Sequence, residues 1–185
     1  DDPGGMRRNL AAFDRFAALL RGGAVAAIFP EGVSRDDPAL APVKTGAARI
    51  AFGAGAADPT GAPVAVLPVG LQFEPRRRFR AEALVRIGPA VPVADLAAAH
   101  AADPRAAARA LTERIAEAMK RLAFHLEDPA RADLAERIAR VYWKRARTTG
   151  IGAFGARARR GELHQKVAAA INHFGRPMNG MTTLF

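Results

Sequence analysis

The 185-residue sequence contains no cysteine, one tryptophan, one tyrosine and no long apolar segment. The lack of cysteine excludes a disulfide framework, a cysteine-ligated metal site and thiol catalysis. No apolar run approaches the roughly 18–20 residues that a membrane-spanning helix needs. The chain begins with Asp1, and its first residues show no signal-peptide pattern. Its length suits one domain, or one domain with an appendage, and can enclose a sizeable core.

Acidic residues are outnumbered two to one by basic residues in the second part of the chain, residues 101–185. The net charge is +10, of which residues 1–100 contribute +2 and residues 101–185 contribute +8. Arginine outnumbers lysine 24 to 4, and 44 residues are alanine, so large core side chains are scarcer than the apolar content of 50% indicates. An excess of base over the whole chain is weak evidence for any particular partner.

The pattern of apolar residues predicts an α/β part followed by a helical part. Helices are expected at 6–21 and 45–56, and buried strands at 24–29, 63–71 and 83–87. Later, Asp103–Pro104 and Asp128–Pro129 each predict the start of a helix, and Gly175 predicts the end of another. We therefore expect one domain at 1–96 and a basic helical extension at 97–185.

The residues with chemical potential follow the first predicted strand. Glu31 brings a carboxylate into the loop, and Gly32 allows a sharp turn or close approach to a ligand. Arg35 offers a planar fork suited to phosphate. Lys44 precedes a predicted helix start at Thr45, whose free amides also favour an anion. These residue types fit a phosphorylated substrate, and they also fit an ordinary loop with an ion-paired Glu31 and a capping lysine.

Three ordered motifs between Ala24 and Val93 resemble a known family. The first is Phe-Pro-Glu-Gly at 29–32, then a serine and Leu-x-Pro-x-Lys-x-Gly at 40–46. The second and third are Val-Leu-Pro-Val-Gly at 66–70 and Ile-Gly-Pro at 87–89. Together they are similar to the third and later signature blocks of the glycerol-3-phosphate and 1-acylglycerol-3-phosphate acyltransferases. The resemblance implies part of a mixed sheet flanked by helices, before the basic all-helical extension.

The resemblance implies acyl transfer in phospholipid synthesis, from acyl-CoA or acyl-carrier protein to a hydroxyl of a glycerol phosphate. It implies glycerol-3-phosphate, dihydroxyacetone phosphate or lysophosphatidate as the acceptor and the acyl thioester as a co-substrate, and no metal or bound cofactor is expected. The family's arginine stands two places after the glycine, where this chain has serine, and Arg35 follows one place later. The substrate-binding residues that the resemblance implies are Phe29, Pro30, Glu31, Gly32, Ser34, Arg35, Lys44, Thr45, Gly46 and Pro68.

The family's catalytic base, the histidine of an Asn-His-x-x-x-x-Asp block, has no counterpart in this sequence. The residue five places after each histidine is arginine, alanine, alanine or methionine for His100, His125, His164 and His173. We expect all four to be solvated or capping residues of helices. We expect the catalytic block to lie upstream of Asp1, so no catalytic residue is assigned in this chain.

The basic half has three interpretations. From Arg137 to Arg160 there are eight lysines or arginines and no acid, interspersed with aromatic residues. The segment fits a solvated helix face, a membrane-surface patch or a nucleic-acid site, and no nucleic-acid-binding motif is present. Basic residues near anionic head groups gain about 1 kcal/mol each, and aromatic residues favour the interface. The membrane-surface residues expected are Arg140, Trp143, Lys144, Arg145 and Arg147.

The expected location is therefore at a membrane, on its cytoplasmic face, with an anionic surface as partner and without nucleic acid. The alternative to an acyltransferase is a non-catalytic membrane-surface or nucleic-acid-binding module on the same scaffold. The Gly-x-Gly-x-x-Gly pattern at 150–155 follows a predicted helix, whereas a dinucleotide site needs a preceding strand. We expect a hinge there.

The missing block leads to a first prediction. The 185-residue chain alone should show no acyltransferase turnover, because no histidine in it has the aspartate that orients the base. Incubation with labelled glycerol-3-phosphate and acyl-CoA, followed by lipid extraction, measures this. Turnover above a protein-free control would contradict the prediction.

Overall fold

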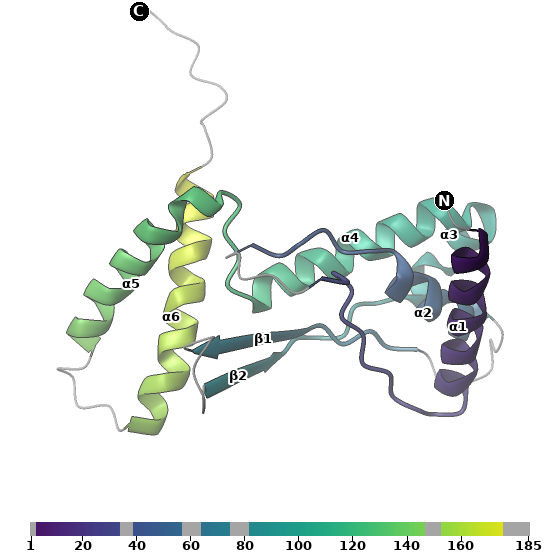
Figure 1. Cartoon of the computed structure of the whole chain (residues 1–185), viewed down its shortest axis with the longest axis horizontal. Coiled ribbons are helices and arrows are strands. Elements are labelled where there is room, and N and C mark those ends of the chain that lie inside the picture. The colour runs from purple at the N-terminus through teal and green to yellow at the C-terminus, as the bar shows by residue number, and fades with distance from the viewer. Residues whose placement is uncertain (1–2, 34–38, 57–63, 75–81, 147–152, 176–185) are drawn as a thin grey trace, which may run out of the picture. The chain divides into compact units, whose positions relative to one another are not determined.

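The computed structural model describes residues 3–33, 39–56, 64–74, 82–146 and 153–175, which are mainly helical (Figure 1). The helices are α1 (Pro3–Arg21), α2 (Gly46–Ala56), α3 (Ala97–Ala102), α4 (Pro104–Leu122), α5 (Ala132–Ala146) and α6 (Ala153–Phe174). Two short 3-10 helices, η1 (Ala94–Leu96) and η2 (Pro129–Arg131), precede α3 and α5. Strands β1 (Val69–Glu74) and β2 (Glu82–Ile87) form a two-stranded antiparallel sheet. The predicted combination of helices and sheet is confirmed.

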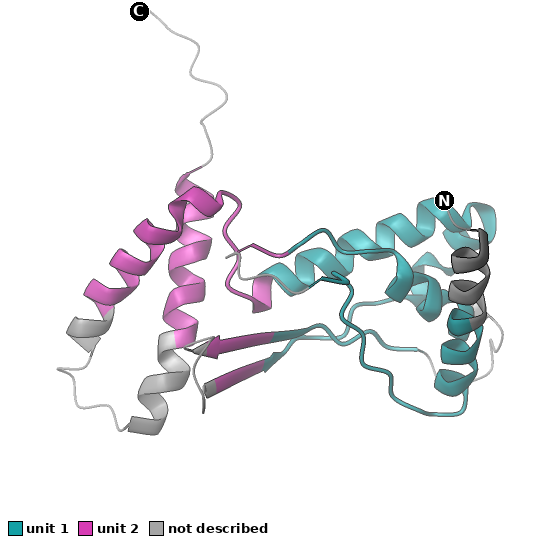
Figure 2. Ribbon diagram, in the orientation of Figure 1, with its two compact units in different colours: residues 1–35, 41–70, 86–120 teal, residues 36–40, 71–85, 121–185 magenta. Residues whose placement is uncertain are grey.

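The chain divides into two compact units, which Figure 2 colours separately. The first comprises residues 1–35, 41–70 and 86–120, and the second comprises residues 36–40, 71–85 and 121–185. Residues 104–120 of α4 therefore belong to the first unit. The functional division at residue 96 stays a prediction.

Small side chains build most of the core of the first unit. Phe52, Leu111 and Ile115 are the large buried members of its main cluster, and Leu111 is fully buried. The remaining buried members are alanine or valine, from α2, α4 and the segment at 91–93. A core of this composition removes less apolar area from water per residue than one built of leucine or phenylalanine. The few large side chains consequently carry much of its stability.

Helices α1 and α2 pack closely because small residues lie between them. A β-carbon added at Gly53 would lie 3.6 Å from the β-carbon of Ala17, which is buried. The guanidinium of Arg21 donates to the carbonyl of Gly53 at 3.0 Å. In addition, the guanidinium carbon of Arg49 lies 5.1 Å from the centre of the Phe13 ring, within cation–π range. These contacts hold α1 against α2, whose start carries predicted phosphate-binding residues.

Both predicted capping carboxylates are confirmed. The carboxylate of Asp103 accepts from the backbone N–H groups of Arg105 and Ala106 at 2.9 and 3.0 Å, at the start of α4. The Ala106 N–H stabilises the charged form most, and the pKa of Asp103 is held below its ordinary value of 3.8. Asp128 accepts from Ala130 at 3.1 Å and caps η2, so α5 itself begins only at Ala132.

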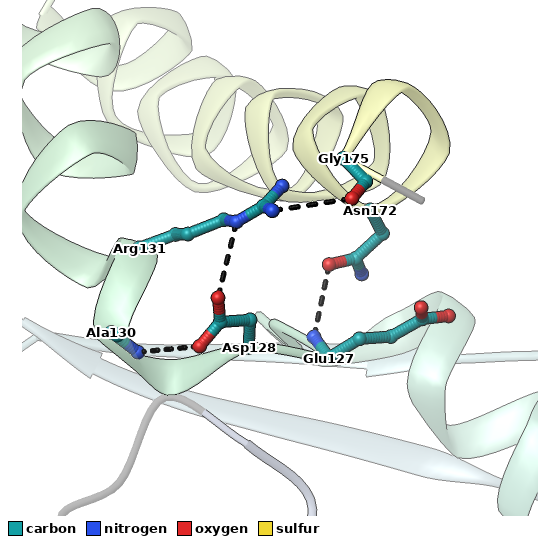
Figure 3. A network of polar contacts seen from close by, with 6 residues as sticks. All are labelled: Glu127, Asp128, Ala130, Arg131, Asn172 and Gly175. Carbon is teal, nitrogen blue, oxygen red and sulfur yellow. Dashed lines mark hydrogen bonds and ion pairs between the residues drawn. The ribbon is translucent and has the colours of Figure 1, made fainter. Parts of the chain in front are cut away.

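The second unit is built on the pairing of α5 and α6. Its core contains the fully buried Leu126 and residues from both helices, which are Ala135, Ala139, Val167, Ala168 and Ile171. Polar contacts join residues 127–131, which precede α5, to the C-terminal end of α6 (Figure 3). Arg131 donates to Asp128 and to the carbonyl of Gly175, each at 3.2 Å, and the side-chain oxygen of Asn172 accepts from the Glu127 N–H at 2.9 Å. The predicted helix end at Gly175 is confirmed.

The strand predicted at 24–29 is wrong. These residues form no regular element, and their large apolar side chains are exposed, with Val25 at 96% and Phe29 at 76%. A strand requires a neighbour to accept and donate backbone hydrogen bonds. Among the residues that the structure describes, no strand lies beside this segment. An apolar run therefore did not determine a strand here.

Of the other two strand predictions, one is confirmed and the other is confirmed in part. The strand predicted at 83–87 is β2, whereas the one predicted at 63–71 forms only an isolated antiparallel bridge, Val66 to Val91, before β1 begins at Val69. The carbonyl of Pro68 accepts from the N–H of Gly88 at 2.9 Å. Because proline has no N–H to return the bond, regular pairing begins one residue later. A sheet of mixed strand direction is not seen in the described part of the chain.

Within the described ranges, no helix is long and apolar enough to cross a membrane. The Gly-x-Gly-x-x-Gly pattern lies partly outside those ranges, at 150–152, and its remaining residues lie in the first turn of α6. The element before the pattern is helix α5 rather than a strand. In the part of the chain that the structure describes, no βαβ unit of a dinucleotide site surrounds the pattern.

Candidate functional site

The candidate site lies where the segment after α1 turns back beside the start of α2. The Gly32 N–H donates to the carbonyl of Phe29 at 3.1 Å, which closes a tight turn over residues 29–32. Gly32 has a φ of +65°, in the left-handed region where residues with a β-carbon are disfavoured. The glycine that the motif predicted is therefore required by the backbone of this turn.

Two hydrogen bonds join this turn to residues 41–44. The Lys44 N–H donates to the carbonyl of Pro30 at 2.9 Å. The Ala41 N–H donates to the carboxylate oxygen Oε2 of Glu31 at 2.7 Å, in a half-buried position. Glu31 therefore stabilises the loop, because its side chain binds the backbone of Ala41 on the opposite side. Only one of its carboxylate oxygens is engaged by this bond.

The side chain of Lys44 lies over Gly32. A β-carbon added at Gly32 would lie 2.7 Å from Nζ of Lys44 and 3.2 Å from its Cε. Lys44 is exposed, and it forms no ion pair with any residue that the structure describes. The lysine charge therefore lies beside the turn and is available to an anion from solvent.

The start of α2 adds a second source of positive potential. The Arg49 N–H donates to the carbonyl of Thr45 at 3.0 Å, so Thr45 stands at the helix start, and the first turn contains no acidic residue. The free amides of a helix start favour an anion by about 0.3–1 kcal/mol. Gly46 packs beside Phe13, 3.6 Å from the position of an added β-carbon, which leaves little room there for a larger residue.

Not all of the predicted site residues belong to this cluster. The structure brings Pro30, Glu31, Gly32 and Lys44 together, next to Thr45 and Gly46. The Phe29 side chain is exposed, and Pro68 is buried at the start of the sheet. Ser34 and Arg35 lie outside the described residues, and so does Arg147. The proposed roles of these residues stay predictions.

Sequence reasoning missed two of the polar contacts near this segment. The bond between Glu31 and the Ala41 amide spans ten residues, and no local motif announces it. In the second unit, Nδ1 of His125 accepts from the Leu40 N–H at 3.0 Å. His125 is half-buried, and the half-buried His100 stacks on Phe52 with ring centres 4.2 Å apart. The prediction of solvated or capping histidines is therefore wrong for these two.

Part of the basic surface is visible on α5. Arg140 is exposed and pairs with Glu136 at 2.8 Å, one helical turn away. Beside it, Val141 and Tyr142 are exposed to 70% and 60%. Trp143, Lys144 and Arg145 continue α5, but their side chains lie outside the described residues.

Comparison with known proteins relates part of the chain to the glycerol-3-phosphate acyltransferases. A stretch of 61 residues is 52% identical to glycerol-3-phosphate O-acyltransferase 2 of Saccharomyces cerevisiae. This stretch is 33% of the present chain and 8% of the yeast protein. The family relationship predicted from the motifs is thus confirmed for a partial region. No family model and no solved structure matches the chain.

The turn geometry gives a second prediction with a matched control. Gly32→Ala should lower the free energy of unfolding by about 1–2 kcal/mol, because alanine is strained at a φ of +65°. Gly55 lies in α2 with open space around it and an ordinary helical backbone. Gly55→Ala should therefore raise the free energy of unfolding by about 0.5–1 kcal/mol. Urea denaturation measures both, and effects of the same sign would contradict the assigned turn.

Proposed function

We propose that the chain carries the acceptor-binding part of a glycerolipid O-acyltransferase with an acyltransferase-like fold. The enzyme would move a fatty acyl group from acyl-CoA or acyl-carrier protein to a hydroxyl of a glycerol phosphate in phospholipid synthesis. The 52% identity over 61 residues to a glycerol-3-phosphate O-acyltransferase carries this proposal. The lysine beside a positive-φ glycine turn supports it independently.

The cluster supplies the parts that an acceptor phosphate needs. The Lys44 ammonium offers a charge-assisted hydrogen bond, and the adjacent amides of α2 contribute partial positive charge. Glu31 holds the loop and keeps one carboxylate oxygen for a hydroxyl of the acceptor. Arg35, close in sequence, is proposed as a second phosphate ligand. With the phosphate held, the reacting hydroxyl is oriented by the same contacts.

The chemical step would need a general base that this chain does not supply. The hydroxyl oxygen forms a bond to the thioester carbon, the carbon–sulfur bond breaks, and the hydroxyl proton passes through the base to the leaving thiolate. A positioned base of this kind contributes about 10²–10⁴-fold to the rate. No histidine here has an aspartate five places later. We therefore propose that the base comes from outside this chain and that no metal or resident cofactor takes part.

The acceptor proposal gives a third prediction. Lys44→Met should weaken binding of glycerol-3-phosphate to the 185-residue chain by about tenfold or more, because a hydrogen bond to a charged group is worth roughly 1.5–3 kcal/mol. Isothermal titration with glycerol-3-phosphate measures the affinity. In a catalytically complete acyltransferase carrying this segment, the same change should raise KM for the acceptor and leave KM for the acyl donor unchanged.

Lys120→Met is the matched control. Lys120 is on α4 in the same unit and pairs with Glu117 at 2.7 Å on the helix surface. Its replacement should leave glycerol-3-phosphate binding within twofold of the unmodified chain. Equal binding by the Lys44→Met chain, or equal loss in both variants, would contradict the assignment of Lys44.

We also propose that the basic helical part lies against an anionic membrane on its cytoplasmic face. The residues proposed to contact lipid are Arg140, Trp143, Lys144, Arg145 and Arg147. Support comes from the exposed Val141 and Tyr142 beside Arg140, because exposed apolar, aromatic and basic side chains together suit a lipid interface. The acylated product of the proposed reaction also belongs in a bilayer.

Vesicle sedimentation provides a fourth prediction. The chain should sediment with vesicles that contain anionic phosphatidylglycerol and remain in solution with pure phosphatidylcholine vesicles. Added salt should release it, because the attraction of exposed charges is screened. Equal binding to both vesicles, or none, would contradict the electrostatic membrane contact. Salt-sensitive retention on DNA without vesicle binding would favour the nucleic-acid-binding alternative.

A further inference from the structure

An open apolar groove of about 440 Å³ runs between α5 and α6 in the second unit. Its walls are the side chains of Ile138, Tyr142, Leu163, Val167, Ile171 and Phe174, with Ala170 and Lys166 completing the lining. The volume lies within the range of about 300–1,000 Å³ typical of small-molecule sites. None of these lining residues belongs to the loop that carries Glu31 and Lys44.

The shape of the groove is elongated. On α6 its lining residues recur from Leu163 to Phe174 at helical spacing, which corresponds to about 16 Å along the helix axis. The rim is apolar and open to solvent, with Tyr142 60% exposed and Phe174 84% exposed. An apolar groove that extends along α6 fits an extended hydrocarbon chain better than a compact ring system.

The charged residue in the groove lining indicates which kind of head group an occupant would carry. Lys166 is the one charged residue in the lining, is exposed, and forms no ion pair with any residue that the structure describes. On the facing helix, Glu136 is paired with Arg140 at 2.8 Å. The charge within the groove lining is therefore positive and complements an anion.

From these observations we propose that the groove binds one fatty acyl chain that carries an anionic head group. The chain lies along α6 between Ile138 and Ile171, and the head group binds the Lys166 ammonium. This assignment does not rest on the proposed acceptor site, which involves other residues of another unit. Failure of one proposal leaves the other intact.

The experiment measures binding of monomeric myristate to the 185-residue chain, by displacement of the fluorescent fatty acid cis-parinarate below the micellar concentration. Affinity should rise from decanoate to myristate, by up to about fourfold for each methylene buried. Lys166→Gln should weaken myristate binding severalfold and leave 1-tetradecanol binding unchanged. Arg137→Gln, an exposed position on α5 outside the lining, should change neither.

A variant whose groove is filled by a larger side chain can be compared directly with a variant that leaves the groove open. Ala170 lines the groove and is exposed, so Ala170→Phe occupies the groove without disturbing the core and should reduce myristate affinity at least tenfold. Ala169→Phe, next to it and outside the lining, is the matched control and should bind as the unmodified chain does. Circular dichroism of both variants verifies that α6 is retained.

Other occupants give different results, and each overturns the proposal. Equal binding by the two phenylalanine variants, or affinity independent of chain length, places myristate elsewhere. A concentration-dependent dimer that Ala170→Phe abolishes assigns the groove to a second copy of the chain. Binding to anionic vesicles without binding of monomeric myristate assigns it to a membrane surface.

Discussion

The hydrogen bonds from Lys44 to Pro30 and from Ala41 to Glu31 are the contacts on which the candidate site depends. They connect a tight turn after α1 with the start of α2, across residues 34–38 of the sequence. Each is a backbone group finding its partner in a segment without a regular ladder, where an unpaired buried group would be costly. Without them the Lys44 ammonium would have no fixed relation to the Gly32 turn. The charge, the glycine and the helix start act as one site only because these bonds align them.

One of these two hydrogen bonds gives Glu31 a structural role in addition to the predicted chemical one. In the sequence its carboxylate looks like a free chemical group at the end of an apolar run. In the structure one oxygen already accepts a bond from the backbone, so the residue both shapes the loop and presents its second oxygen. Loss of this carboxylate therefore affects loop geometry as well as any ligand. Lys44, which has no described ion partner, is the cleaner probe of phosphate binding.

Packing in both units depends on small residues that let helices approach, with few large side chains between them. Gly53 meets Ala17 between α1 and α2, and Ala135 and Ala139 are fully or almost fully buried in the second unit. Close packing of this kind positions backbones accurately while burying little apolar area per residue. It also leaves apolar side chains such as Phe174 exposed in the lining of the groove between α5 and α6. The alanine-rich composition is therefore linked to both the helix packing and the open apolar surface.

Local signals in the sequence determined the features that depend on neighbouring residues alone. Asp103 before Pro104 specified a helix start, Gly175 a helix end, and Gly32 a turn, because capping bonds and a positive φ involve only adjacent backbone. The Phe-Pro-Glu-Gly motif likewise indicated the acyltransferase relationship that a partial match confirms. Tertiary structure decided what depends on distant partners. The run at 24–29 is apolar enough for a strand, yet no strand among the described residues lies beside it, and Glu31 reaches an amide ten residues away. A strand and a hydrogen bond both need a second segment, and its place is set by the folded chain rather than by local sequence.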